Sequence, residues 1–328
     1  MKDYRQFLFE SYEKNKKIQW IKNAPVSSSV ESKVLKGLIK DSTDNFYETY
    51  FTADNKVPNL TNEKPILLYY ADKEREIGDK YLSENDITQK DVYNRTEEMV
   101  KSMQKKDWHE LLGDKDWLPK TLTSTKGIDT LEFPIIAKPS EGHSGIGIMK
   151  FDNIEDCQKE LDKKDCKLDV FSEMIKDIDT EYRFIFVKDK LFLVHERIPI
   201  VSENKTIITK DPEESLQFLY VEQDLENEEY DVSKIVEEFR KDIDLDFYAL
   251  DIMLDKNGKY WIIESNSAIG MGGNTLARTY EAICEDFYGE ISKDQKQLVE
   301  RICSDYYKEI KKMYPKEIKK SKNPKIYS

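Results

Sequence analysis

Apolar runs along the chain predict most of its strands. Two long runs, 247–254 and 259–265, are rich in aromatic and β-branched residues and are joined through Asn257-Gly258. Asn-Gly between two such runs predicts a β-hairpin, because a type I′ turn requires positive φ at both central residues. Shorter apolar runs predict further strands at 66–70, 133–138, 146–151, 168–173, 182–187 and 190–197.

Between these runs, apolar residues recur every three or four positions, as on one face of a helix. This period predicts helices over 91–112, 232–243, about 276–288 and 292–312. A shorter helix is expected to follow a cap at Asp152 or Asn153 and to end near Leu161. Strands that alternate with helices predict an α/β (α+β) protein. Residues 1–60 are polar and show no clear period.

The hairpin register predicts a cation site. If 257–258 form the whole turn, Asp251 lies directly opposite Glu264, and Asn266 shares the face of Glu264 because side chains alternate along a strand. Two opposed carboxylates repel each other with Cβ atoms about 5 Å apart, so we expect a cation beside them. Oxygen ligands suit Mg²⁺ or Mn²⁺. The pattern therefore predicts a metal site at Asp251, Glu264 and Asn266.

Composition narrows the class of protein. Of the 328 residues, 38% are hydrophobic and 11% aromatic, which indicates a globular chain with room for two or three subdomains. The net charge of −13 argues against a general nucleic-acid-binding surface, since phosphate contacts need a basic one. Four cysteines without CxxC spacing and three histidines argue against a zinc site.

The sequence shows neither a signal peptide nor a membrane-spanning segment. The first residues are charged throughout, unlike a signal peptide, and no apolar run approaches the roughly 20 residues that a membrane span needs. We therefore expect a cytoplasmic protein that does not enter a membrane.

A glycine-rich loop, 140–147, lies between two predicted strands. It is neither a P-loop nor a GxGxxG motif, and it leads into a strand rather than a helix. Its three glycines expose backbone N–H groups that can approach phosphate oxygens, and Lys138 precedes it with a positive charge. A plain hairpin loop explains the glycines equally well. His143 is compatible both with a hydrogen bond to a phosphate and with an exposed loop position.

In combination and in order, these pieces resemble the ATP-grasp superfamily, especially its D-alanine–D-alanine, RimK-type and glutathione-synthetase ligases. The resemblance covers roughly residues 118–290. The matching segments are Phe133–Pro139 with the following loop, Phe171–Ile175, Glu181-Tyr-Arg183, the Asp-x₁₂-Glu-x-Asn pattern that starts at Asp251, and Asn266–Gly270.

The resemblance implies a role for each matching residue. Catalytic roles fall to Lys138, Arg183 and Arg197. Glu264 would bridge two Mg²⁺ ions, with Asp251 on one and Asn266 on the other. ATP would contact Lys138, Ser140, Gly142, His143, Ser144, Gly145 and Gly147 through its phosphates, Glu173, Met174 and Ile175 through adenine, and Glu181 through ribose.

It also implies an architecture. An N-terminal α/β domain (1–118) would precede a lid subdomain (119–172) and a C-terminal subdomain (173–312) whose antiparallel sheet carries the metals. A basic tail (313–328) would follow, and a solvated, frayed end explains its lysines more simply than a binding partner does.

The implied activity is an ATP-dependent carboxylate–amine ligase that works through an acyl phosphate, on small-molecule or peptide substrates. A kinase that phosphorylates a hydroxyl, and a non-catalytic nucleotide-binding scaffold, are the alternatives; a homo-oligomer is compatible with either. Two departures from the family pattern are Ile269 in place of a proline and Ala249 in place of an arginine. The second shifts substrate binding to Arg183, Arg197 or Arg278. The spacing does not select the earlier nucleotide lysine, for which the candidates are Lys101, Lys105 and Lys106.

Overall fold

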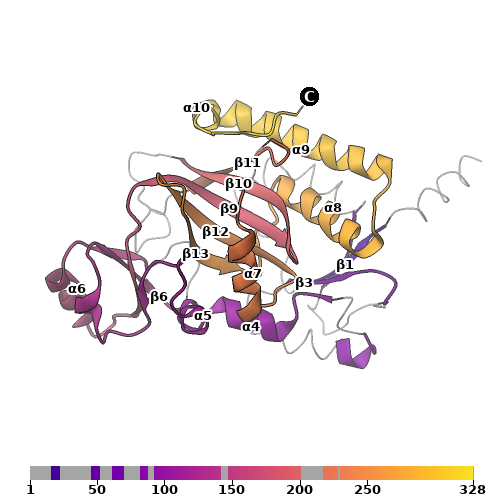
Figure 1. Ribbon diagram of the computed structural model, residues 1–328. Helices are drawn as coiled ribbons and strands as arrows, with labels where there is room; N and C mark the ends of the chain where they lie inside the picture. Colours follow the sequence, from indigo (N-terminus) through magenta and orange to yellow (C-terminus); the bar gives the residue numbers. More distant parts are fainter. Residues whose placement is uncertain are drawn as a thin grey trace, which may run out of the picture.

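Three sheets frame the protein (Figure 1). The computed structural model describes residues 16–22, 46–51, 61–69, 82–87, 92–141, 147–200, 217–227 and 230–327. The N-terminal sheet has the order β2-β1-β3-β4, the lid sheet β5-β8-β6-β7, and the central sheet β11-β10-β9-β12-β13. Pairing is parallel in the first sheet and antiparallel in the other two.

The N-terminal sheet is followed by two helices rather than one. Its strands are β1 (Ile18–Lys22), β2 (Tyr47–Phe51), β3 (Ile66–Tyr69) and β4 (Val92–Tyr93), and its helices are α4 (Thr96–Met103) and α5 (Lys105–Leu112). The single helix predicted over 91–112 is therefore wrong. The extended backbone of Gln104, with φ −93° and ψ 125°, ends the first helix and caps the second.

The lid is a small sheet with one helix, drawn apart from the central sheet in Figure 1. It contains β5 (Thr121–Leu122), the 3₁₀ helix η2 (Ile128–Thr130), β6 (Ile135–Pro139), β7 (Met149–Phe151), α6 (Ile154–Leu161) and β8 (Leu168–Glu173). The Asn153 side chain accepts a hydrogen bond from the Asp156 N–H at 2.9 Å and caps α6. A separate apolar core, which includes Ile135, Phe151 and Phe171, holds the lid together.

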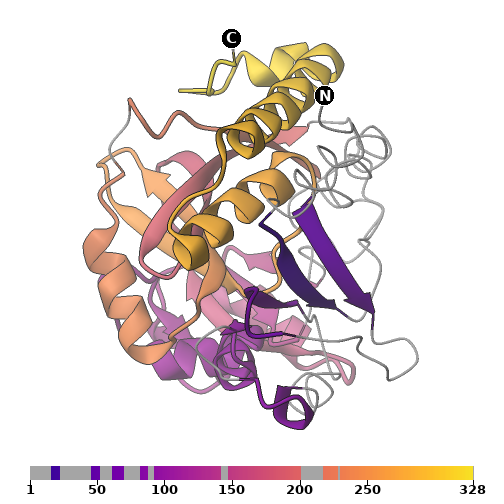
Figure 2. The same cartoon turned by 90° about the vertical axis from the view of Figure 1, so that its right-hand side faces the viewer.

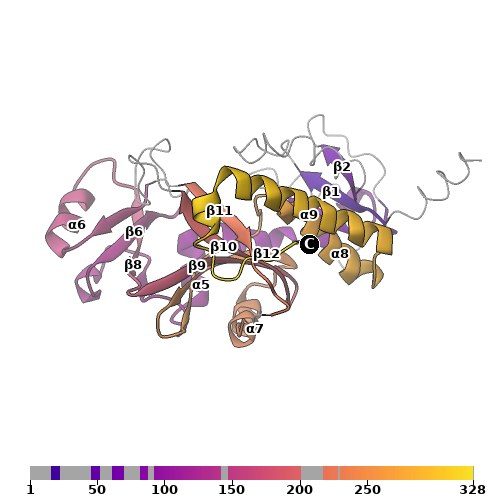
Figure 3. The ribbon, with the colours of Figure 1, turned by 90° about the horizontal axis from the view of Figure 1, so that it is seen from above.

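Helices cover both faces of the central sheet (Figure 3). Its strands are β9 (Ile178–Val187), β10 (Lys190–Ile200), β11 (Gln217–Glu222), β12 (Phe247–Asp255) and β13 (Tyr260–Asn266). The helices are α7 (Ser233–Asp242), α8 (Asn274–Tyr288), α9 (Lys293–Met313) and α10 (Pro315–Ile318). None of the helices in the described ranges is long and apolar enough to cross a bilayer.

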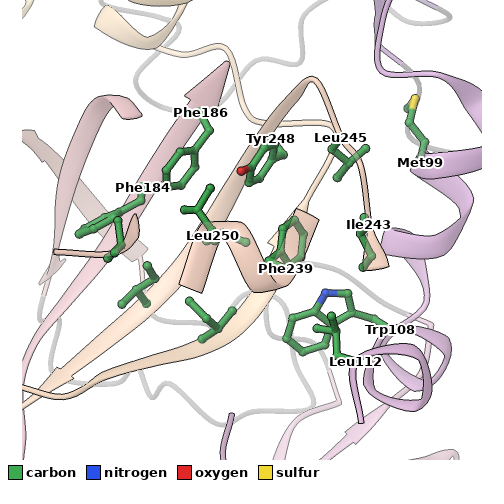
Figure 4. Packing of buried hydrophobic residues seen from close by; sticks show 14 of the residues in the cluster. Met99, Trp108, Leu112, Phe184, Phe186, Phe239, Ile243, Leu245, Tyr248 and Leu250 are labelled. Atoms are coloured by element: carbon green, nitrogen blue, oxygen red, sulfur yellow. The ribbon is translucent and has the colours of Figure 1, made fainter. Parts of the chain in front are cut away.

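Each face of the sheet has its own core. Figure 4 shows Phe184, Tyr248 and Leu250 of the strands on the side of α7, where Phe239 stacks on Tyr248 with ring centroids 5.3 Å apart. Alternate positions of the same strands face α8 and α9. In Figure 2 these helices lie between the central sheet and the N-terminal strands, and Tyr280 of α8 stacks on Phe46 just before β2, with centroids 4.2 Å apart.

The β12–β13 hairpin places Asp251 opposite Glu264, as predicted, but by a different path. The turn is not type I′, because only Gly258 has positive φ (+85°); Asp255 N–H donates to Lys259 O across a three-residue loop. That loop shifts the pairing by one residue. A bulge at Ile263 shifts it back, since Asp251 pairs with Glu264 while Ile252 pairs with Ile262.

The lysine-rich end is packed on the protein, which corrects the expectation of a solvated tail. After α10 the chain lies along the end of β11, where Asp224 N–H donates to Asn323 O at 3.1 Å and Lys325 N–H donates to Glu222 O at 2.8 Å. Gln223 and Pro324 form an isolated antiparallel bridge. The segment therefore covers one end of an edge strand.

We expect Phe239→Ala to lower the free energy of unfolding by about 3–5 kcal/mol, because it removes a fully buried ring between α7 and the sheet. Urea titration followed by circular dichroism measures the loss. Val100→Ala on α4, where the side chain is 45% exposed, serves as the control. Equal midpoints for both variants would contradict this picture of the core.

Candidate active site

A row of charged side chains interrupts the apolar face of the central sheet that α8 covers. The strand register pairs Arg183 of β9 with Asp251 on one side and with His195 on the other, and it pairs Arg197 with Tyr220 of β11. Paired residues point to the same face. Three strands therefore direct one carboxylate and two guanidinium groups into one region.

Asp251 is held by two arginines. The Arg183 guanidinium forms a bidentate pair with it, with Nε–Oδ1 at 2.7 Å and Nη2–Oδ2 at 2.8 Å, and Arg197 lies 3.4 Å from Oδ2. Burial opposes ionisation of Asp251, but the two arginines outweigh it and hold the pKa of this carboxyl below its usual range. Arg197 also forms an ion pair with Glu181, the residue expected at ribose.

Glu264 faces two lysines. The Lys105 Nζ, on the first residue of α5, lies 3.5 Å from Glu264 Oε1. Lys138 at the end of β6 is buried; burial and the charge of Lys105 lower its pKa, while Glu264 and Asp251 oppose that shift. Lys138 of the lid and Lys105 of α5 thus lie near the two carboxylates of the β12–β13 hairpin.

The three lysines left open by the sequence now differ. Lys101 pairs with Glu98 at 2.7 Å and Lys106 lies 3.9 Å from Glu110, both on their own helices. Lys105 alone of the three has an ion pair with Glu264 among the described residues. Lys105 is therefore the candidate for the earlier nucleotide lysine.

The donor set at the hairpin suits a hard cation. Asp251, Glu264 and Asn266 offer oxygen atoms only, and the described ranges contain no group of three or more His, Cys, Asp or Glu that could enclose a metal. Mg²⁺ fits such a sparse set, because it usually takes one or two carboxylates and completes its shell with phosphate and water. The buried Asn266 Nδ2 and Arg197 Nε lack hydrogen-bond partners within the described residues, as expected where a polar ligand is to be added.

The ends of the glycine loop are anchored. Ser140 O and Oγ each accept a hydrogen bond at 3.2 Å, from the N–H groups of Lys105 and Lys106. Gly147 has φ +78°, and a Cβ there would lie 3.2 Å from Pro139. The hydroxyl of Ser140 thus holds the base of the loop to α5. Gly142, His143, Ser144 and Gly145 lie outside the described residues.

The predicted adenine segment joins the lid to β9. The N–H groups of Glu173 and Met174 already donate to Lys120 O at 2.9 Å and Pro134 O at 3.0 Å. Ile175 has no such bond within the described residues, so its N–H is the one of the three that suits a base edge. The Met174 side chain is exposed.

Sequence reasoning missed two aromatic residues at the site. The Tyr220 ring lies 5.1 Å from Arg183 Cζ and 5.9 Å from Arg197 Cζ, and the Phe218 ring lies 4.3 Å from Arg197 Cζ. Alternation in β11 was the only signal for them. Arg278, the third arginine considered for substrate binding, forms ion pairs with Glu222, Glu281 and Glu300 rather than with Asp251.

Comparison with known proteins identifies the fold. No family model matches this sequence, and no curated protein is significantly similar to it. Solved structures are similar: the D-alanine–D-alanine ligase from Bacillus anthracis complexed with ATP is 16% identical over 90% of this chain and 99% of its own, with a TM-score of 0.53. The ADP complex of PurK, the N5-carboxyaminoimidazole ribonucleotide synthetase, is 12% identical over 82% and 76%, with a TM-score of 0.52.

The ATP-grasp ligase PsnB complexed with a minimal precursor is 14% identical over 77% of this chain and 91% of its own, with a TM-score of 0.49. The two structures with TM-scores above 0.5, the D-alanine–D-alanine ligase and PurK, show that the chain has the mixed α/β ATP-grasp fold, which confirms the resemblance drawn from its motifs at the level of the fold. The individual site residues remain predictions.

A buried histidine behind the arginines makes stability depend on pH. The Nε2 of His195 lies 3.1 Å from Asn274 Oδ1, and burial lowers the pKa of His195 to about 4, against a smaller opposing effect of Glu222. Between that value and the usual 6.5, the unfolded chain binds the proton more readily. The contribution is fully present above pH 6.5 and is lost as pH falls toward 4, a loss on the order of 3 kcal/mol.

We expect His195→Asn, which keeps a side-chain N–H donor, to lose less stability than the wild type over this pH range. Denaturant titrations at pH 7.5, 6, 5 and 4 measure the difference. Parallel curves for the two proteins would show that His195 does not titrate as a buried neutral group.

Proposed function

We propose that this protein is an ATP-dependent ligase that joins a carboxylate to an amine and releases ADP and phosphate. The carrying observation is the convergence of Lys105, Lys138, Asp251 and Glu264 from α5, the lid and the hairpin. The fold, shared with a solved ligase bound to ATP, supports the proposal. Its substrates would be small-molecule or peptide acids and amines, and its place the cytoplasm, where ATP is supplied.

The proposal assigns the nucleotide to the junction of the lid and the central sheet. Lys105 and Lys138 would hold the phosphates, with the glycine loop above them, and the Ile175 N–H would receive adenine. Glu181 would bind ribose once Arg197 turns to the phosphate. Boundaries near residues 118 and 172 would let the lid move as a unit over the site.

Asp251, Glu264 and Asn266 would bind two Mg²⁺ ions. When bound, Mg²⁺ supplies neutralising charge to the β- and γ-phosphate oxygens during transfer. Asp251 and the two arginines beside it would then exchange partners. Arg183 and Arg197 would turn from Asp251 to the transferred phosphoryl group, since a guanidinium matches phosphate with two parallel hydrogen bonds.

The substrate carboxylate would attack the γ-phosphorus of ATP, break its bond to the bridging oxygen and release ADP, which leaves an acyl phosphate. The amine would then attack the acyl carbon and expel phosphate, with loss of its proton, to form the amide. Arg183 and Arg197 would hold the acyl phosphate between these steps. Tyr220 and Phe218 would limit the freedom of the two guanidinium groups by stacking on them.

We expect acid- and amine-dependent ADP release to fall at least about 100-fold in Glu264→Gln, with the circular dichroism spectrum unchanged. Pairs of amino acids and peptides are screened for ADP formation, and the product is examined by mass spectrometry. Glu237→Gln, on the outer face of α7, is the matched control. A phosphorylated product would favour a kinase, and undiminished turnover in Glu264→Gln would contradict the metal assignment.

We further expect Lys105→Met to weaken Mg-ATP binding by about 10- to 100-fold, because it removes a charged hydrogen bond to phosphate. The neighbouring Lys106→Met, whose ammonium lies 3.9 Å from Glu110 on its own helix, should bind like the wild type. Isothermal titration calorimetry compares the two. Equal affinities would remove Lys105 from the nucleotide site.

A further inference from the structure

The C-terminal segment reaches a buried carboxylate behind the candidate site. Glu222 at the end of β11 is 6% exposed, and four groups approach its two oxygens. Arg278 Nε lies 3.1 Å and Lys325 Nζ 3.8 Å from Oε1, while Asn274 Nδ2 and the Tyr327 hydroxyl donate to Oε2. Two of the four come from the last residues of the chain.

Asn274 connects this cluster to the catalytic face of the sheet. It is the first residue of α8, and its side chain donates to Glu222 while its Oδ1 accepts from His195 Nε2 at 3.1 Å. This assignment makes Nε2 the protonated nitrogen of a neutral imidazole. His195 in turn is the register partner of both Glu222 and Arg183. Glu222 therefore fixes the orientation of Asn274 and, through it, the start of α8.

The loop 267–273 runs from the predicted metal ligand Asn266 to Asn274. Its first half is held by the N-terminal part of the chain, since Asn94 Nδ2 donates to Ser267 O at 3.0 Å and the Tyr69 hydroxyl donates to Ile269 O at 2.5 Å. At its other end Gly273 has φ +61°, and a Cβ there would lie 2.6 Å from the Tyr306 ring. The second half packs on α9 through Gly273 and on the core through the buried Met271, and it leads directly into Asn274.

Hydrogen bonds from residues 321–323 fix the C-terminal segment to the central sheet. Ser321 Oγ and Lys322 N–H both donate to Glu196 Oε2, at 2.7 and 2.9 Å, and Asn323 N–H donates to Gln223 Oε1 at 3.2 Å. These bonds place the following residues, Lys325 and Tyr327, beside Glu222. Arg278 is held in the cluster by two further ion pairs, with Glu281 at 2.9 Å and with Glu300 at 2.8 Å.

We propose that Tyr327 and Lys325 are positioning residues of the candidate site, which act through Glu222 on Asn274 and on the loop that follows Asn266. Without their donors, the charge of Glu222 is under-compensated in a buried place, and the Glu222 carboxylate, to which Asn274 is bonded, is held in position by fewer contacts. The end of the loop at Asn274 is then held less firmly, and so is Asn266 at its start. The proposal rests on the function proposed above.

The test uses Tyr327→Phe in the full chain, which removes one hydroxyl and keeps the ring. We expect amide hydrogen exchange in peptides covering 266–276 to rise by about tenfold, with exchange at 168–175 in the lid unchanged. Lys325→Met should show a smaller rise. The matched control is Tyr314→Phe, in the same region of the chain. Equal exchange in wild type and Tyr327→Phe would overturn the proposal.

A second readout separates positioning from mere stability. The Mg²⁺ concentration that gives half-maximal ADP formation should rise about tenfold in Tyr327→Phe. This rise should be larger than the loss of folded enzyme, judged from the melting temperature, can account for. Faster exchange with an unchanged Mg²⁺ requirement would reduce the tail to a structural clamp and overturn the positioning role. Absence of Mg²⁺-dependent ADP formation in the wild type would instead overturn the proposed function, and it is seen before any substitution is made.

Discussion

The placement of Asp251 directly opposite Glu264 is the constraint around which the site is organised. Two like charges on adjacent strands repel strongly where water is scarce, so each needs cations close by. Arg183 and Arg197 serve Asp251 from β9 and β10, and Lys105 serves Glu264 from α5. Lys138 lies within the field of both carboxylates. The neighbouring strands, the lid and α5 are each tied to the hairpin by one of these contacts.

Under the proposed function, these ion pairs would exchange partners when a metal and a phosphate bind. A buried ion pair is weak evidence for stability, because desolvation offsets much of the attraction. In the proposed function, a metal would take the place of an arginine beside Asp251 while that arginine turns to phosphate. Arg197 Nε and Asn266 Nδ2 have no hydrogen-bond partner among the residues that the structure describes, so they have capacity for further hydrogen bonds.

Local sequence signals predicted the elements that depend on local physics. The hairpin and strands β9 and β10 of the central sheet were predicted because alternation and period depend on neighbouring residues, whereas β11 was not predicted. The cap of α6 was narrowed to Asp152 or Asn153, and the structure places it at Asn153. Two errors at the hairpin cancelled: the three-residue loop and the bulge at Ile263 each shift the register by one, in opposite directions. Asp251 therefore faces Glu264 because the bulge compensates for the longer loop, and the sequence pattern predicted neither feature.

Features that depend on tertiary packing could not be predicted from the sequence. Strand β1 was missed because Gln19 is polar in sequence, yet it is fully buried and bonds to Thr61 and Lys64. Lys105 could not be separated from its neighbours until α5 was placed beside Glu264. The lysines of the tail suggested a solvated end, whereas Tyr327 and Lys325 reach a carboxylate about a hundred residues earlier in the chain.

The most direct test of the account is the thermal stability of the protein with and without Mg-ATP. If the opposed carboxylates form a metal–nucleotide site, saturating Mg-ATP should raise the melting temperature of the wild type by a few degrees. The rise should shrink in Asp251→Asn, where one metal ligand and the repulsion it relieves are both reduced. An unchanged melting temperature in the wild type, or the same rise in both proteins, would contradict the central claim.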